Sequence, residues 1–133
     1  MYVKRDNVII KTVRNHINKY DPISPSKHLV TRWTNILNKE IFNDKLHPFK
    51  VVEIKRKQDC YADYTGHCKK GYLFGELSIS KTFINKTYFI WTLAHEMVHQ
   101  WQWMEYEKVN HGKSFMKWKS KLNQFEIPLG VSI

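Results

Sequence analysis

Apolar residues recur at helical spacing in two segments near the start of the chain. The first segment begins at Asp6, which could cap a helix, and its apolar positions are Ile9, Ile10, Val13, Ile17 and Tyr20. In the second, Ser24 and Pro25 fit the cap and first position of a helix, because proline lacks the N–H that a first turn leaves unpaired. This second helix is predicted to end within residues 42–44, and its apolar stripe is Leu29, Val30, Trp33, Ile36, Leu37 and Ile41.

Between residues 48 and 80 the pattern becomes that of β-strands. The stretch PFKVVEIKRK is rich in β-branched residues, and CYADYTGHCKKG is a shorter candidate strand or hairpin segment bounded by turn residues. In YLFGELSIS the side of the strand that carries apolar residues changes at Gly75. A bulge or sharp twist is therefore predicted at this glycine.

Two further helices are predicted after the strands. One runs from Asn85–Thr87 to Glu105 with a broad apolar face, from which Trp103 diverges and is expected to be more exposed than Trp101. The other covers HGKSFMKWKSKLNQF as one helix with Phe115, Trp118, Leu122 and Phe125 on one side. Strands grouped between helices favour an α+β fold, in which residues 1–133 form a single domain with an antiparallel or mixed sheet.

The charge of the chain is strongly unbalanced. Lys and Arg number 22 against 12 Asp and Glu, a formal net charge of +10, and such a surplus attracts polyanions. Nucleic acid is the commonest partner of this kind, and an anionic membrane surface is a weaker option. Lys113, Lys117 and Lys121 recur every four residues. They form either a solvated helix face or a nucleic-acid-binding stripe.

The two cysteines and the N-terminus bear on the cellular compartment. Cys60 and Cys68 make neither a disulfide framework nor the short spacing of a zinc ribbon, which favours reduced thiols in a cytoplasmic protein. No apolar leader core or stretch of membrane-spanning length is seen. The expectation is a soluble cytoplasmic monomer without membrane association.

The stretch HEMVHQ contains the residues that could form a catalytic metal site. On a helix, His95 and His99 project from the same face and can aim two imidazole nitrogens at one Zn²⁺. Glu96 lies about 100° further round the helix, close enough to accept a proton from water that the metal activates. The carboxylate can then pass that proton to a leaving amine. The alternative is an ordinary helix with two unrelated histidines.

A catalytic zinc site usually has three protein ligands and one open position. Gln102 and Glu105 stand where the metzincin pattern needs Gly and His, so that subclass is excluded. Glu126 is one candidate for the third ligand. His111 is the stronger candidate, because Gly112 lets the chain turn back toward the preceding helix.

These motifs resemble the SprT-like metallopeptidase domain of the SprT/Spartan family. TLAHEMVHQW followed by HGKSF carries the resemblance, and NKEIFNDKL and GELSIS with KTF extend it over about residues 30 to 120. Many family members carry a four-cysteine zinc ribbon after this domain, whereas the present sequence ends at Ile133 without one. The resemblance is therefore to a short form, and a phage-encoded origin would place it in the host cytoplasm.

The resemblance implies a zincin-like fold with helices flanking a small, mostly antiparallel sheet. It implies one Zn²⁺ held by His95, His99 and His111, with Glu96 as general base and acid. An edge strand at residues 76–80 is expected to align the substrate by backbone pairing. The implied reaction is hydrolysis of peptide bonds in proteins bound or crosslinked to DNA, as in DNA–protein crosslink repair.

Three functions stay open at this point. The first is a zinc protease that acts on DNA-associated proteins, with DNA as partner. The second is a small phage-type metallopeptidase that cuts a specific regulator without DNA. The third is a non-catalytic DNA-binding module whose zinc is structural, which would require a fourth protein ligand.

Overall fold

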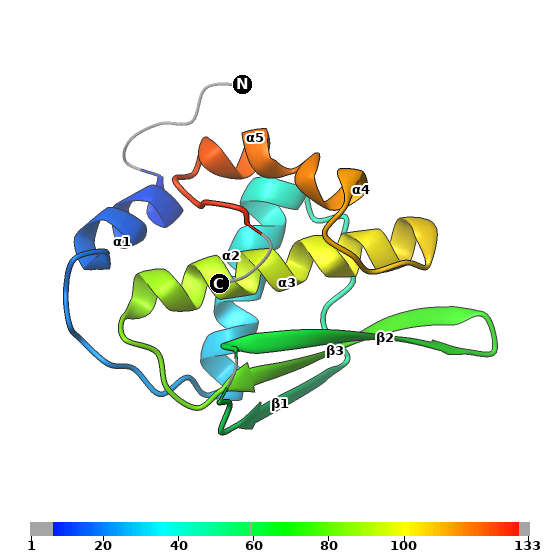
Figure 1. Cartoon of the computed structure of the whole chain (residues 1–133), viewed down its shortest axis with the longest axis horizontal. Helices are drawn as coiled ribbons and strands as arrows, with labels where there is room; N and C mark the ends of the chain where they lie inside the picture. The colour runs from blue at the N-terminus through cyan, green and yellow to red at the C-terminus, as the bar shows by residue number, and fades with distance from the viewer. Residues whose placement is uncertain (1–6, 59, 131–133) are drawn as a thin grey trace.

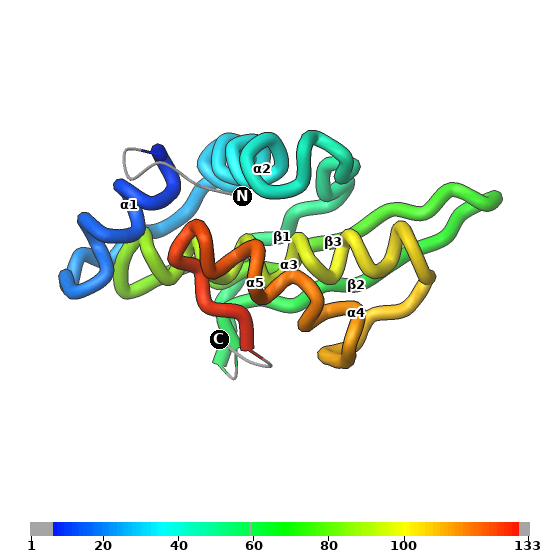
Figure 2. Tube along the Cα trace, turned by 90° about the horizontal axis from the view of Figure 1, so that it is seen from above, coloured from blue at the N-terminus to red at the C-terminus, as the bar shows by residue number. Residues whose placement is uncertain are grey.

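The computed structural model describes residues 7–58 and 60–130, and these form a small α+β domain. Figure 1 shows helix α3 across the middle, with the sheet on one side and the C-terminal helices on the other, and Figure 2 shows α2 along one flank of α3. The predicted fold class is confirmed. The elements are α1 (Val8–His16), α2 (Lys27–Phe42), β1 (Val51–Lys55), β2 (Ala62–Lys69), β3 (Tyr72–Ser80), α3 (Lys86–Tyr106), α4 (Lys113–Met116) and α5 (Lys119–Asn123).

The three strands form a mixed sheet in the order β1-β3-β2. β2 and β3 are an antiparallel hairpin, while β1 pairs parallel to β3 from Val51↔Glu76 to Lys55↔Ser80. β3 is therefore the central strand and has a neighbour on each side. The prediction that residues 76–80 form an edge strand is wrong, because both sides of this segment are already paired.

The hairpin pairing is continuous through Gly75, which lies opposite Gly66. The predicted bulge is therefore absent from this described ladder. A glycine is needed at position 75 for space instead, because an added Cβ would lie 2.0 Å from Gln100 Oε1 and 2.4 Å from the Tyr64 hydroxyl. The change of apolar side arises because Leu77 and Ile79 reach the core, while the outer face near the hairpin tip carries aromatic rings.

The first two helices begin later than their predicted caps. Asn7 caps α1 by accepting from the Ile9 N–H at 2.9 Å, while Asp6 lies outside the described residues. α1 ends at His16, so Tyr20 is not on its buried face and is 82% exposed. Ser26, not Ser24, caps α2, because its hydroxyl accepts from the Leu29 N–H at 3.1 Å.

The predicted C-terminal helix is divided into α4 and α5. At the junction the Trp118 N–H donates to the Phe115 carbonyl at 3.2 Å, an i→i+3 bond that tightens the turn. The Trp118 ring packs against Phe42 and Trp101, with centroids 4.7 and 5.4 Å away. The apolar side is nonetheless as predicted, since Phe115, Leu122 and Phe125 are buried.

Helix α3 contacts α1, α2, α4, β2 and β3, so it is buried on most of its circumference. Asn85 caps it by accepting from the Tyr88 N–H at 3.0 Å, and its amide also donates to the Lys19 carbonyl at 2.9 Å. The Thr87 hydroxyl donates to the Val13 carbonyl of α1 at 2.8 Å. The start of α3 is thereby fixed to the N-terminal segment. Among the described residues, no helix combines the length and apolar character needed to cross a membrane.

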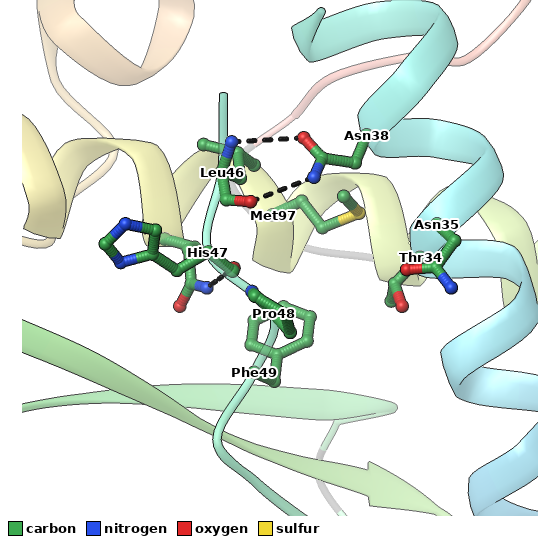
Figure 3. Close-up of a pocket in the computed structure, with 9 residues that line it drawn as sticks. Thr34, Asn35, Asn38, Leu46, His47, Pro48, Phe49 and Met97 are labelled. Carbon is green, nitrogen blue, oxygen red and sulfur yellow. Dashed lines mark hydrogen bonds between the residues drawn. The ribbon is translucent and has the colours of Figure 1, made fainter. Parts of the chain in front are cut away.

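The chain between α2 and β1 is tied to both α2 and α3 (Figure 3). The Asn38 side chain donates to the Leu46 carbonyl at 2.9 Å and accepts from the Leu46 N–H at 3.1 Å. The Gln100 amide of α3 donates to the His47 carbonyl. These bonds satisfy backbone N–H and C=O groups in the segment between α2 and β1, which has no regular secondary structure.

Candidate metal centre

Three histidine side chains converge at the middle of α3. His95 and His99 lie one turn apart on this helix and are 6% and 5% exposed, while the exposed His111 approaches from the loop before α4. The Nε2 atom of His111 lies 3.2 Å from Nε2 of His99 and 3.4 Å from Nε2 of His95. The three residues thus offer one ligand atom each, all within 4.8 Å of one another.

The separations of 3.2 and 3.4 Å match the spacing of ligands around a tetrahedral metal. Two ligands about 2.0–2.1 Å from Zn²⁺ at the tetrahedral angle are about 3.3 Å apart. The described part of the chain supplies three histidines and no further His, Cys, Asp or Glu to this cluster. The arrangement therefore suits an ion with three nitrogen ligands and a fourth position left for another molecule.

The environment keeps the two helix histidines in their neutral, metal-binding form. Burial, helped by His99 and His111, lowers the pKa of His95 to about 3. The pKa of His99 is lowered chiefly by burial and also by His111, against a hydrogen bond to Gln102 that raises it. Neutral imidazoles with free Nε2 lone pairs are the species that bind zinc.

Glu96 is buried beside the histidines without a partner that would explain its burial. It is 5% exposed, and its Oε1 lies 3.9 Å from His95 Nε2. Its Oε2 is buried and has no hydrogen-bond partner among the described residues. Burial raises the pKa of this carboxyl to about 8; nearby Asp63 raises it further, while Lys57 opposes the shift. A carboxyl with this pKa can exchange protons near neutral pH.

Glu126, the alternative third ligand, is engaged elsewhere. Its carboxylate accepts from Arg14 Nε at 2.8 Å and from the Arg14 Nη2. Its carbonyl accepts from Trp91 Nε1 at 3.2 Å, which ties the C-terminal segment to α3. Of the two candidates, the structure brings His111 to the cluster.

Buried polar side chains next to the site were not predicted from the sequence. Gln102 Oε1 lies 2.8 Å from His99 Nδ1, and the Tyr64 hydroxyl of β2 donates to Gln100 Oε1 at 2.9 Å. Both glutamines lie on α3 and are at most 2% exposed. The available signal was the spacing of Gln102, three residues after His99 and hence on the same face.

Trp103 connects α3 to β2. Both Trp103 and Trp101 are partly buried. The Trp103 indole lies over Gly66, and its Nε1 donates to the His67 carbonyl at 3.1 Å. A Cβ at position 66 would lie 2.4 Å from that indole, so the close approach of strand and helix requires glycine there.

The predicted lysine stripe is only partly a free surface. Lys113 and Lys117 are exposed, and Lys121 is half-buried. Lys117 Nζ lies 5.1 Å from the centroid of the Trp101 ring, a cation–π contact. Lys113 lines a hollow of about 420 Å³ beside the His111 loop, together with Tyr106, Lys108, Asn110, Gly112 and Ser114.

Comparison with known proteins agrees with this geometry. The model of the SprT-like family matches residues 30–132, which include the histidine cluster and the sheet. The chain belongs to the SprT-like family. No curated protein matches the chain. The family and the convergent histidines together identify a metallopeptidase-like domain that could hold a metal ion.

The raised pKa of Glu96 predicts a pH-dependent effect of its removal on stability. Because the folded-state pKa is about 8 against an ordinary 4.5, the metal-free protein loses stability as pH rises between these values. Glu96→Gln stays neutral and avoids this loss. Its unfolding free energy should exceed that of the wild type by on the order of 2–4 kcal/mol at pH 9. The excess should vanish below pH 4.5.

Urea unfolding in the presence of a chelator would measure this difference at several pH values. The titration of His95 occurs in both the wild type and Glu96→Gln, so it cancels from the difference between their unfolding free energies. Glu105→Gln, at an exposed position of the same helix, is the matched control and should show no such trend. A stability difference independent of pH would contradict the raised pKa.

Proposed function

We propose that the protein is a zinc-dependent peptidase whose substrates are proteins associated with DNA. The observation that carries the first half is the convergence of three histidines, with His111 Nε2 at 3.2 and 3.4 Å from the other two Nε2 atoms, beside a buried carboxyl whose Oε2 has no hydrogen-bond partner among the described residues. Membership of the SprT-like family supports it. The DNA half rests on the basic charge of the chain and is tested separately below.

His95, His99 and His111 would hold the ion, and Glu96 would move protons. A zinc ion in this position would act as a Lewis acid and make water a nucleophile near neutral pH. Glu96 accepts a proton from the attacking water and delivers it to the nitrogen of the leaving amine. In the metal-free protein burial raises the pKa of this carboxyl to about 8, and the positive charge of a bound ion would oppose that shift.

A purely structural zinc is the less favoured alternative. Structural sites are normally closed by four protein ligands, whereas the cluster within residues 7–58 and 60–130 has three. The exposure of His111 leaves a route by which a substrate could reach the site. Burial of the Glu96 Oε2 without a hydrogen-bond partner in residues 7–58 and 60–130 would also be costly in a site without proton transfer.

Strand β2 is the edge that could align a peptide. The Ser80 N–H donates to the Tyr61 carbonyl at 2.8 Å, which sets the alternation of hydrogen bonds in the antiparallel ladder. By that alternation the backbone groups of Ala62, Tyr64 and Gly66 point away from β3. A substrate added as a fourth strand would therefore bind along this edge. The Tyr64 side chain connects the same stretch to α3 through Gln100.

The second candidate is the same peptidase acting on one regulatory protein without DNA. The contact of Lys117 with the Trp101 ring favours it, because a lysine held over an indole is less available to phosphates. The dependence of DNA binding on salt separates the two candidates.

The proposed chemistry predicts that zinc binding and proton transfer can be removed separately. Glu96→Gln should keep one bound zinc and lose about 10²–10⁴-fold in the rate of peptide cleavage, because it cannot accept a proton. His99→Ala should lose both zinc and cleavage. Elemental analysis of the purified proteins and cleavage of an unfolded protein substrate would measure the two properties. Undiminished cleavage by Glu96→Gln would contradict the role of this carboxyl.

Pairing along β2 predicts an alternating response to blocked backbone groups. A single N-methyl group moved along a cleavable peptide removes one N–H at a time. Cleavage should fall strongly at every second position, where the N–H faces the strand, and little at the positions between. A fall that follows side-chain identity instead would contradict strand addition. A scan of matched peptides with side chains truncated to alanine is the control.

A phosphate-binding stripe predicts a salt-dependent affinity for DNA. Simultaneous replacement of Lys113, Lys117 and Lys121 by Ala should weaken binding and lower the slope of log K against log salt by roughly 0.9 for each lost phosphate contact. Replacement of the exposed Lys27, Lys39 and Lys45 by Ala removes the same charge and is the matched control. No binding to DNA by the wild type at low salt would favour the second candidate.

A further inference from the structure

Gln102 links His99 to the loop that carries His111. It lies one turn after His99 on α3 and is 0% exposed. Its Oε1 lies 2.8 Å from Nδ1 of His99 and also accepts from the Asn110 N–H at 3.3 Å. One oxygen atom therefore faces both a ligand on the helix and the loop that carries the third histidine.

The other end of the same amide holds that loop a second time. Gln102 Nε2 donates to Ser114 Oγ at 2.8 Å and to Asn110 Oδ1 at 3.2 Å. Asn110 Oδ1 in turn accepts from the Gly112 N–H at 2.9 Å. The contacts of Gln102 thus bracket His111, reaching the residue before it and Ser114 at the start of α4.

The polarity of this network decides which nitrogen of His99 is protonated. An amide oxygen only accepts, so the hydrogen bond at Oε1 requires a proton on His99 Nδ1. In a neutral imidazole the other nitrogen then carries the lone pair, and Nε2 of His99 is the atom that faces His111. The Asn110 N–H at Oε1 and the acceptor Oδ1 at Nε2 fix the orientation of the amide.

We propose that Gln102 is a positioning residue of the metal centre, which fixes the Nδ1–H tautomer of His99 and tethers the His111 loop. The proposal rests on the metal centre put forward above. Partners in this position typically contribute 10–100-fold to metal affinity. The effect arises because a ligand held in the right tautomer and orientation needs no rearrangement on binding.

Four variants separate the two contacts from general packing. Gln102→Leu removes both contacts, and Gln102→Glu retains an acceptor for His99. Asn110→Ala, at an exposed position, leaves the His99 contact intact and removes part of the loop tether. Gln100→Leu is the matched control, because Gln100 is 2% exposed on the same helix and bonds to His47 and Tyr64 instead.

Two measurements apply to each variant. Competition with a chromophoric chelator at pH 7.5 gives zinc affinity, and long-range ¹H–¹⁵N spectra of the metal-free protein give the tautomer of His99. Gln102→Leu should bind zinc about 10–100-fold more weakly and lose the Nδ1–H tautomer. Gln102→Glu should keep the tautomer and lose less affinity than Gln102→Leu, because a carboxylate still accepts from His99 but cannot donate to Asn110 and Ser114. Asn110→Ala should weaken binding while keeping the tautomer.

Each outcome bears on one claim. Unchanged affinity and tautomer in Gln102→Leu, or an equal loss of affinity in Gln100→Leu, would overturn the role of Gln102. If Gln102→Leu does not fold, Asn110→Ala and Gln102→Glu decide, because weaker binding in the first and a retained tautomer in both are required. Absence of zinc binding by the wild type would instead remove the metal centre, while the tautomer of His99 would still be read in the metal-free protein.

Discussion

Three imidazoles converge so closely that Nε2 of His111 lies 3.2 Å from Nε2 of His99 and 3.4 Å from Nε2 of His95, and the packing around α3 makes this convergence possible. Burial of His95 and His99 on α3 disfavours their protonation, so the rings do not repel one another as cations would. That burial needs neighbours on every side of the helix. The sheet, α1, α2 and α4 supply them.

The same constraint explains why α3 carries so many buried polar side chains. Thr87, Asn85 and Gln100 each hydrogen-bond to a neighbouring segment, which offsets the cost of removing them from water. Glu96 differs from them, because its Oε2 finds no partner within the described part of the chain. A carboxyl kept in this state is typical of a group that works on a ligand.

Local features of the site could be predicted from the sequence. The spacing of His95 and His99 fixes their common face through the geometry of one helix, and no tertiary information is needed. His111 followed from Gly112 and a short connection to that helix. Glu126 could be set aside only with the structure, because its pairing with Arg14 joins residues far apart in the sequence. The roles of these residues in catalysis stay predictions.

Features that depend on distant partners were missed. Residues 76–80 lie in the central strand of the sheet. The alternation of residues within β3 shows which side chains face the core, but it does not show which strands pair with β3. The C-terminal helix divides near Trp118, whose ring packs against Phe42 and Trp101 in distant segments. Gln102 had a visible spacing signal, but its bonds to Asn110 and Ser114 depend on a loop conformation that spacing alone does not give.

The position of β3 between β1 and β2 has a consequence for how the domain assembles. β1 and β2 come first in the chain but are not neighbours, so the space between them stays open until β3 enters it. The β2–β3 ladder closes over a short turn, whereas pairing of Val51 with Glu76 must close a longer loop at greater entropic cost. β3 is followed along the chain by α3, which packs on β2 and β3, so the histidine-bearing helix rests on the two strands that complete the sheet. A chain with an incomplete sheet would lack part of the surface that supports its candidate metal ligands.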